Sequence, residues 1–306
     1  MEQRVAIVTG GLRGLGRAMT FGLAREGYHI LAVGHIDADV ATVEAEAGAI
    51  KPRGQILPLV ADLRRPAECD RVVAIALSRF GGVHTLVNNA GLTFTTIDPA
   101  RFRRPEPQKF WQVPDDIVRA VIETNYLAAD QMARRVAPLM VEQGWGRIVN
   151  VTTKLDTMNR PHTSPYGASK AALEMATEVW AKEVDGTGLT INIVNPGAGA
   201  NTPGMAEEMR AMSREGRAPR LVEKTWSRRS SMSSRPKPTT STAGASTPTS
   251  GTRHCRRWKP PAAPAAPPAS KCTSNRLEDA ARSGHSSGKP AWRKPAYSVF
   301  SARAMN

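Results

Sequence analysis

The chain has 306 residues, three cysteines and a formal net charge of +15. It contains no run of about 18 consecutive apolar residues, which excludes a membrane-spanning helix, and its cysteine spacing fits neither a zinc site nor a disulfide framework. A strand-like run begins almost at Met1 and leaves no room for a cleavable targeting segment, so we expect a cytoplasmic protein without bound metal.

Up to about residue 194, short apolar runs alternate with longer segments of helical period. The runs predict strands at 5–8, 30–33, 56–60, 85–87, 147–151 and 190–194. Helices are predicted between them, among others at 14–27, 66–80, 115–144 and 164–186. Such alternation is typical of βαβ units with a mostly parallel sheet that is buried on both faces. We therefore predict one α/β domain, a Rossmann-type doubly wound sheet, over residues 1–223.

A glycine-rich turn, Thr9-Gly-Gly-Leu-Arg-Gly-Leu-Gly16, follows the first predicted strand and opens a helix. Glycines in this context permit a tight turn and the close approach of a pyrophosphate, which the free N–H groups and dipole of the helix would hold. The turn therefore predicts a dinucleotide site, with contacts from Gly10, Arg13, Gly14, Leu15 and Gly16.

A tyrosine and a lysine, Tyr166 and Lys170, stand four residues apart in a predicted helix. This spacing places both side chains on one helix face, where the ammonium would lower the phenol pKa and make it a usable acid or base. A surface pair on a helix is the alternative interpretation, and the upstream motifs argue against it.

The order and spacing of T-G-x-x-x-G-x-G, N-N-A-G and Y-x-x-x-K, from Val5 to about Met205, resemble the short-chain dehydrogenase/reductase family. The resemblance implies an NAD(P)-dependent enzyme that interconverts a secondary alcohol and a ketone. It also implies a homodimer or homotetramer. By position it assigns Asp62 and Leu63 to adenine, Asn89, Ala90 and Gly91 to closing the cofactor cleft, and Pro196 and Gly197 to the turn beneath the nicotinamide.

The same resemblance assigns the catalytic set. Tyr166 would exchange the proton, Lys170 would tune it and hold the nicotinamide ribose, and Asn125 would hold a water for proton relay. The family usually has a serine at the strand end upstream of the tyrosine, at the position where this chain has Thr153. Threonine keeps the hydroxyl and adds a methyl group. Thr152 is a second candidate for this role, and a strand-end threonine that only satisfies the backbone is a third interpretation.

The choice between NAD and NADP depends on the end of the second predicted strand. NAD-preferring enzymes place an acid there for the ribose 2′-hydroxyl. This chain has Gly34 followed by His35, which we include among the expected cofactor contacts. Arg13 matches an arginine that faces the 2′-phosphate in related reductases. NADP is therefore favoured, and Asp37 leaves NAD open.

The interval between Gly91 and Asn125 is longer than is usual in the family. The extra segment, 94–111, is rich in Arg and Lys and contains Phe110 and Trp111. It predicts either a basic, aromatic lip that selects an acidic or bulky substrate, or a solvated surface loop. His162, just before the catalytic tyrosine, is a further candidate for substrate contact.

The segment 224–306 differs in composition from the rest. It holds 16 of the 42 Lys and Arg residues and two of the 27 acidic residues, so it carries +14 of the net charge. It is rich in Ser, Thr, Pro and Ala without periodicity, which predicts a disordered tail. The Gly-x-x-hydrophobic-x-hydrophobic-Asp-Gly-Gly strand that ends the family's sheet does not occur.

Three interpretations of this tail stay open. Arginines around Trp258 could bind nucleic acid, although no recognisable fold supports such a partner and we do not expect one. The missing strand could leave a catalytically impaired dinucleotide-binding protein, or a weakened oligomer. We favour the hypothesis of a shifted reading frame near codon 223, because synonymous codons allow 241–259 to encode a glycine–aromatic–aspartate strand in another frame.

Overall fold

A computed structural model describes residues 3–196 and 201–216. All of them belong to the first of two units into which the chain divides, Met1–Pro238 and Thr239–Asn306. The predicted tail and its disorder therefore lie outside the described residues, as does Gly197. No helix in the described part is long and apolar enough to cross a membrane.

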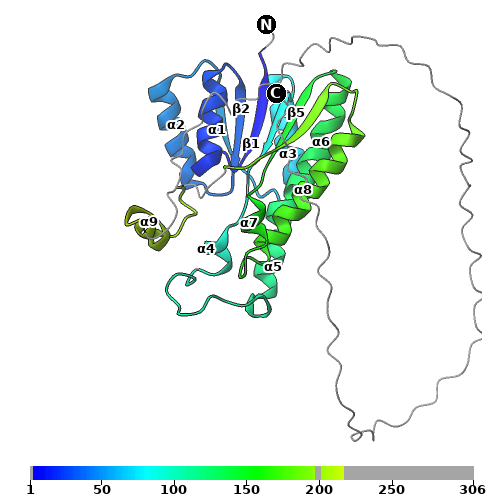
Figure 1. Ribbon diagram of the computed structural model, residues 1–306. Coiled ribbons are helices and arrows are strands. Elements are labelled where there is room, and N and C mark those ends of the chain that lie inside the picture. The colour runs from blue at the N-terminus through cyan, green and yellow to red at the C-terminus, as the bar shows by residue number, and fades with distance from the viewer. Residues whose placement is uncertain (1–2, 197–200, 217–306) are drawn as a thin grey trace, which may run out of the picture. The chain divides into compact units, whose positions relative to one another are not determined.

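Six parallel strands form one sheet in the order β3-β2-β1-β4-β5-β6, which confirms the predicted doubly wound fold (Figure 1). The chain passes from β3 to β4 across β2 and β1, so the strand order reverses between β1 and β4. In such sheets ligands bind beyond the carboxyl ends of the strands at this reversal. The strands are β1 (Val5–Thr9), β2 (His29–Gly34), β3 (Ile56–Val60), β4 (Thr85–Asn88), β5 (Gly146–Val151) and β6 (Leu189–Val194).

Helices cover the sheet in two layers because side chains alternate along each strand. Ala6 and Val8 of β1 pack in one core cluster with residues of α1 (Gly14–Arg25) and α2 (Ala38–Ile50). Ile7 points to the other face and packs with residues of three further helices. These are α3 (Pro66–Phe80), α6 (Ala128–Glu142) and α8 (Tyr166–Glu183).

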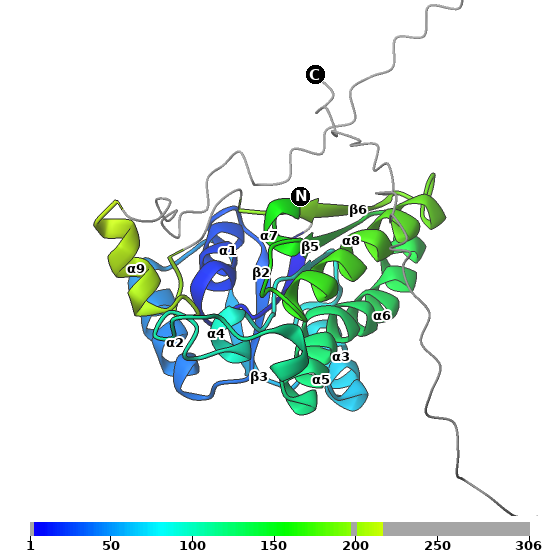
Figure 2. The same cartoon turned by 60° about the horizontal axis from the view of Figure 1, so that its bottom comes forward.

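The predicted helix at 115–144 is three elements. These are α5 (Asp115–Ile122), the π-helical turn η2 (Glu123–Leu127) and α6. The remaining elements are α4 (Phe94–Ile97), η1 (Phe110–Gln112), α7 (Leu155–Met158) and α9 (Glu207–Arg214). Of these, α4, α7 and α9 lie beyond the carboxyl ends of the strands, beside the strand-order reversal (Figures 1 and 2).

Strand β6 forms one edge of the described sheet, and β3 forms the other. Within the described residues β6 pairs only with β5, and no strand follows it. Leu189 and Ile191 are buried beneath α8, whereas Thr190 and Asn192, on the opposite face, are exposed. The prediction of a sheet buried on both faces is therefore wrong at β6. Alternate side chains of this strand meet no covering helix there.

Candidate active site

The glycine turn, residues 9–16, is shaped by close backbone contacts between β1 and α1. Gly10 and Gly14 have φ angles of +63° and +56°, in the left-handed region that glycine adopts without strain. A Cβ on Gly16 would lie 2.0 Å from the carbonyl oxygen of Gly10 and 2.5 Å from Asn89 Nδ2. A larger residue at position 16 would push the turn apart.

The N-terminus of α1 is suited to an anionic group. No side chain caps it, and its first turn contains no acidic residue. The first N–H groups of a helix have no partner within it, and the helix dipole favours negative charge there. The glycine turn has the charge and backbone geometry that the pyrophosphate of a dinucleotide needs, and its contacts with a cofactor stay a prediction. Leu15 is partly buried and packs against the core cluster beneath α1.

The segment after β4 holds the glycine turn from the other side of the strand-order reversal. Thr9 Oγ1 accepts the backbone N–H groups of Asn89 and Ala90, both at 3.0 Å. Asn89 Nδ2 donates to the carbonyl oxygens of Thr9 at 3.0 Å and Gly10 at 3.3 Å. The amide of Asn89 thus fixes the backbone that would contact the cofactor.

Asn125 connects this segment to α8. It is buried in η2, and a π-helical turn is a feature that often marks functional sites. Its Oδ1 accepts the N–H of Leu92 at 2.7 Å, and its Nδ2 donates to the Leu92 carbonyl at 3.1 Å and to Ser169 Oγ at 3.0 Å. A Cβ on Gly91 would lie 3.3 Å from Asn125 Oδ1 and 3.6 Å from Lys170 Nζ. Three of the predicted site residues are therefore neighbours.

Tyr166 and Lys170 lie one turn apart at the start of α8. Lys170 is buried, and its Nζ donates to the carbonyl oxygen of Val151 at the end of β5, at 2.8 Å. Burial lowers the pKa of Lys170 to about 8, and the Glu174 carboxylate acts in the opposite direction. Burial raises the pKa of the Tyr166 phenol above its ordinary value, while a side-chain hydrogen bond with Thr153 lowers it.

The net pKa shift of Tyr166 is opposite to the one predicted from the tyrosine–lysine spacing. Burial disfavours the phenolate more than its hydrogen bond with Thr153 favours it. The ammonium of Lys170 donates to the Val151 carbonyl of β5. Tyr166 is therefore protonated at neutral pH.

Two residues near this set were not selected from the sequence. Ser169 Oγ accepts from Asn125 and donates to the carbonyl oxygen of Tyr166 at 2.7 Å. Glu174 Oε1 accepts the Thr152 hydroxyl at 2.6 Å. Glu174 follows Lys170 by four residues, so the same helix-face argument could have found it. With Thr152 bound to Glu174, Thr153 is the threonine whose side chain reaches Tyr166.

Comparison with known proteins agrees with this geometry. The profile of the family described as short chain dehydrogenase matches residues 4–213. The chain belongs to the short-chain dehydrogenase family. The predicted family is thereby confirmed.

Relatives of this short-chain dehydrogenase include several oxidoreductases. The 3-oxoacyl-(acyl-carrier-protein) reductase of Synechocystis is 32% identical over 197 residues, covering 64% of this chain and 74% of that protein. D-beta-hydroxybutyrate dehydrogenase of Rhizobium meliloti is 31% identical, covering 63% and 70%. The structure of actinorhodin polyketide ketoreductase with NADPH matches with a TM-score of 0.61 at 26% identity, covering 73% of this chain and 86% of that one.

The residues predicted to distinguish NADP from NAD lie in the glycine turn and after β2. Arg13 is bound to Asp39 on α2, with Nε to Oδ2 at 2.7 Å and Nη2 to Oδ1 at 3.0 Å. A Cβ on Gly34 would lie 2.7 Å from the Leu12 side chain, so a larger residue there would have to displace Leu12. His35 is exposed just beyond it. Asp39 is a residue the sequence reasoning missed, because only the fold brings it to Arg13.

The pair predicted to contact adenine follows β3. Asp62 forms an ion pair with Arg64 at 2.7 Å, and its hydrogen bonds with Arg64 lower the pKa of its carboxyl. Leu63 is buried in the core. Pro196 is exposed after β6. The roles of these residues toward a cofactor stay predictions.

Thr202 also lies beside the glycine turn, although the sequence reasoning did not select it. A Cβ on Gly14 would lie 3.3 Å from the Cβ of Thr202 and 3.6 Å from Pro203 Cδ. The segment before α9 thus returns to the start of α1. Nothing in the local pattern of 201–204 predicts this contact, since it joins the beginning of the domain to its last described segment.

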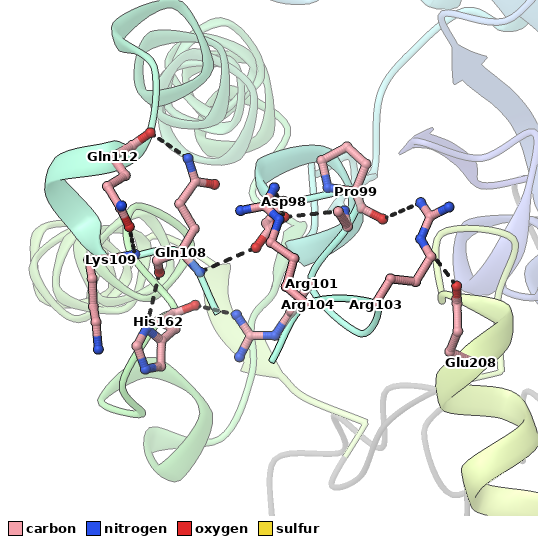
Figure 3. A network of polar contacts seen from close by, with 11 residues as sticks. Asp98, Pro99, Arg101, Arg103, Arg104, Gln108, Lys109, Gln112, His162 and Glu208 are labelled. Carbon is pink, nitrogen blue, oxygen red and sulfur yellow. Dashed lines mark hydrogen bonds and ion pairs between the residues drawn. The ribbon is translucent and has the colours of Figure 1, made fainter. Parts of the chain in front are cut away.

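The segment predicted to face substrate, taken here as residues 94–112 and called the substrate segment below, contains a network of polar contacts (Figure 3). Buried Asp98 pairs with Arg104 at 3.0 Å and accepts the N–H groups of Ala100 at 3.2 Å and Gln108 at 3.4 Å. Arg103 reaches Glu208 of α9 at 3.5 Å. The segment is thus held by polar contacts, and whether it selects a substrate as a basic, aromatic lip or is a surface loop stays a prediction.

His162 joins this segment to the loop before Tyr166. Its Nδ1 lies 3.0 Å from the Gln108 carbonyl oxygen, and its own carbonyl accepts from Arg101. Its φ of +64° is uncommon for a residue with a side chain. Beside it lies a cleft of about 470 Å³, which Phe110 and Trp111 line together with Lys109, Arg160 and His162. Both aromatic side chains are about two-thirds exposed, at 68% and 69%.

Proposed function

We propose that the chain is an NADP(H)-dependent oxidoreductase that interconverts a secondary alcohol and a ketone. The observation that carries this proposal is the convergence of Thr153, Tyr166 and Lys170 beyond the carboxyl ends of β4 and β5. The Thr153 side chain lies near enough to the Tyr166 phenol to lower its pKa, and Lys170 is anchored to β5 one helical turn away. This cluster adjoins Gly91 and, through Asn89, the glycine turn.

In the proposed reaction Tyr166 acts first as an acid. Its raised pKa keeps the phenol protonated at neutral pH, so it can donate a hydrogen bond and then a proton to a ketone oxygen. The Thr153 hydroxyl would bind the same oxygen and stabilise the phenolate left behind. A bound nicotinamide supplies or accepts the hydride.

Lys170 and Asn125 position this acid. The buried ammonium of Lys170 places a positive charge near the phenolate that forms, which lowers the cost of proton transfer. Asn125 holds α8 to the segment after β4 through Ser169 and Leu92. A water that relays the proton would have to bind outside these contacts of Asn125 with Ser169 and Leu92.

The catalytic assignment is tested by substitution. Tyr166→Phe should lower kcat by about 100- to 10,000-fold while the Kd for cofactor changes little, because only the transferable proton is lost. Lys170→Ala should both lower kcat and weaken cofactor binding. Thr153→Ser should keep activity and Thr153→Val should lose it. Full activity of the valine variant would show that another group binds the carbonyl.

The NADP assignment rests on Arg13 and on the absence of an acid at Gly34. Titration should give tighter binding of NADPH than of NADH, and Arg13→Gln should narrow the difference. The 2′-phosphate must compete with Asp39 for Arg13. Asp39→Asn should therefore strengthen NADPH binding and leave NADH binding nearly unchanged. Equal or tighter binding of NADH by the unaltered chain would contradict the assignment.

The exposed edge of β6 favours a second candidate, a dinucleotide-binding protein with impaired catalysis. The domain at 1–223 would then bind NADPH without turning over any ketone. We propose a cytoplasmic homodimer or homotetramer that is weaker than a version with a restored final strand, and a dispensable tail at 224–306. Light scattering of the unaltered chain and of the version with the restored strand would test the weaker assembly. Turnover by a chain truncated after Glu223 would test whether the tail is dispensable.

A further inference from the structure

Arg101 differs from the other arginines of the substrate segment because no acidic residue in the described part of the chain pairs with it. Figure 3 shows Arg104 beside Asp98 and Arg103 turned toward Glu208, whereas the guanidinium of Arg101 lies against the backbone of His162. Within the described residues Arg101 forms no ion pair and donates one hydrogen bond, to the His162 carbonyl. A guanidinium has five N–H donors in a planar fork, so most of its donors stay available.

Two charged neighbours act on Arg101, the carboxylate of Asp98 and the guanidinium of Arg160. Burial lowers the pKa of Arg101; Asp98 acts in the opposite direction, and the positive charge of Arg160 adds to the lowering. Asp98 is already occupied by Arg104 and by two backbone N–H groups. Arg160 makes no ion pair either, as far as the structure describes the chain. Arg101 and Arg160 therefore have no ion-pair partner among the described residues, while the Asp98 carboxylate that acts on Arg101 is paired with Arg104.

Arg101 also lies close to the proposed acid. Its guanidinium carbon is 5.2 Å from the centre of the Phe94 ring, and that ring is 4.7 Å from the centre of the Tyr166 ring. One aromatic ring, that of Phe94, thus contacts both the guanidinium and the phenol. This arrangement suits a molecule whose ketone meets Tyr166 while an anionic group a few bonds away meets Arg101.

We propose that Arg101 is the specificity-determining residue of the site and binds the carboxylate of an oxo-acid substrate, with Arg160 adding to the attraction. A planar guanidinium binds a carboxylate through two parallel hydrogen bonds, which fixes orientation as well as charge. Arg160 also lines the 470 Å³ cleft, as does His162, whose carbonyl oxygen accepts a hydrogen bond from Arg101. This inference rests on the proposed oxidoreductase function and names its substrate class.

The test uses the full chain with NADPH and pairs of oxo acids and their methyl esters. One to four methylene groups separate the ketone from the carboxyl group along the series. The acid should be preferred in kcat/KM at one length, by about 10- to 100-fold, as expected for a partly buried charged hydrogen bond. Arg101→Gln should remove this preference by lowering kcat/KM for the acid, while kcat/KM for the ester changes less than about threefold. Arg101→Lys should restore part of it.

Controls separate binding from a structural role. Arg134 is an exposed arginine of α6 that pairs with Asp130. The substitution Arg134→Gln should leave kcat/KM unchanged for both the acid and the ester. If Arg101→Gln is unstable because the His162 contact is lost, Arg160→Gln keeps that contact and should lower the acid preference several-fold. Equal turnover of acid and ester by the unaltered chain, or equal losses for both in Arg101→Gln, would overturn the proposal.

A binding measurement distinguishes this proposal from the reaction itself. Calorimetric titration of NADPH-loaded Tyr166→Phe protein should show tighter binding of the oxo acid than of the ester, and Arg101→Gln should abolish the difference. If no ketone is turned over but this difference is present, the oxidoreductase assignment fails and the anion site stands. A phosphorylated ketone that binds more tightly than every oxo acid would overturn the carboxylate as the ligand and identify phosphate in its place. No difference would refute the site.

Discussion

The cofactor side and the substrate side of this domain are held in place differently. The glycine turn, 9–16, is fixed by backbone contacts and by one amide, Asn89, within distances that admit no additional Cβ. The substrate segment, 94–112, is fixed by side-chain ion pairs and hydrogen bonds to a loop and to α9. Backbone contacts tolerate almost no substitution, whereas side-chain contacts can be exchanged to suit another substrate.

The largest effect is expected at Gly16. Gly16→Ala would place a Cβ 2.0 Å from the Gly10 carbonyl, so we expect a loss of at least about 3 kcal/mol in the free energy of unfolding and loss of measurable NADPH binding. The control is Gly48→Ala in α2, where a Cβ meets nothing within 4 Å. That variant should be unchanged or slightly more stable, because alanine favours the helix. Urea unfolding and cofactor titration measure both. Normal binding by Gly16→Ala would contradict the cofactor-side geometry.

Lys170, where the two sides meet, should give an effect of about 2–3 kcal/mol that depends on pH. The pKa of Lys170 is about 8 in the folded chain, against the ordinary value of 10.5 expected in the unfolded chain. Below pH 8 the buried charge therefore lowers the free energy of unfolding. Lys170→Met should raise the free energy of unfolding at pH 7, partly offset by the lost hydrogen bond to Val151. The gain should shrink between pH 8 and 10.5. In this range Lys170 is neutral in the unaltered folded chain and still protonated in the unfolded chain, so the stability of the unaltered chain rises with pH. A gain that does not change with pH would refute a buried ammonium.

Asp98 tests the substrate side alone. Asp98→Asn should lower the free energy of unfolding by about 1–2 kcal/mol, because Arg104 and two N–H groups lose a charged acceptor. NADPH binding should stay within about twofold, since the glycine turn does not contact Asp98. Asp185→Asn, an exposed residue after α8, is the matched control and should be neutral. A parallel loss of NADPH binding would show that the two sides are not separable.

The smallest effect is expected at the contact with α9. Arg103 and Glu208 are both exposed, so a double-mutant cycle with Arg103→Gln and Glu208→Gln should give a coupling energy below about 0.5 kcal/mol. This coupling should fall further at high salt, because exposed charges are screened. A coupling energy several times larger would mean that α9 is held to the substrate segment as firmly as the backbone holds the glycine turn.

The differences in how the two sides are held also explain which residues the sequence could predict. Gly10, Gly14 and Gly16 were selected because their spacing after an apolar strand has one physical interpretation. Arg13 was selected as a phosphate ligand, yet the structure places it on Asp39, a partner from the next helix. The direction of the Tyr166 pKa shift was wrong for a similar reason. Burial is a property of the assembled domain and not of the four-residue spacing.

The sequence by itself determined the alternation of strands and helices, the doubly wound fold, the family and the positions of the tyrosine and lysine. These follow from local periodicity and from motifs in which neighbouring residues act together. Only the tertiary structure decided that Thr152 binds Glu174, that Asp98 is occupied by Arg104, and that Arg101 has no acidic partner among the described residues near Tyr166. Such contacts join segments far apart in the chain, and the charge left without a partner depends on every pairing around it.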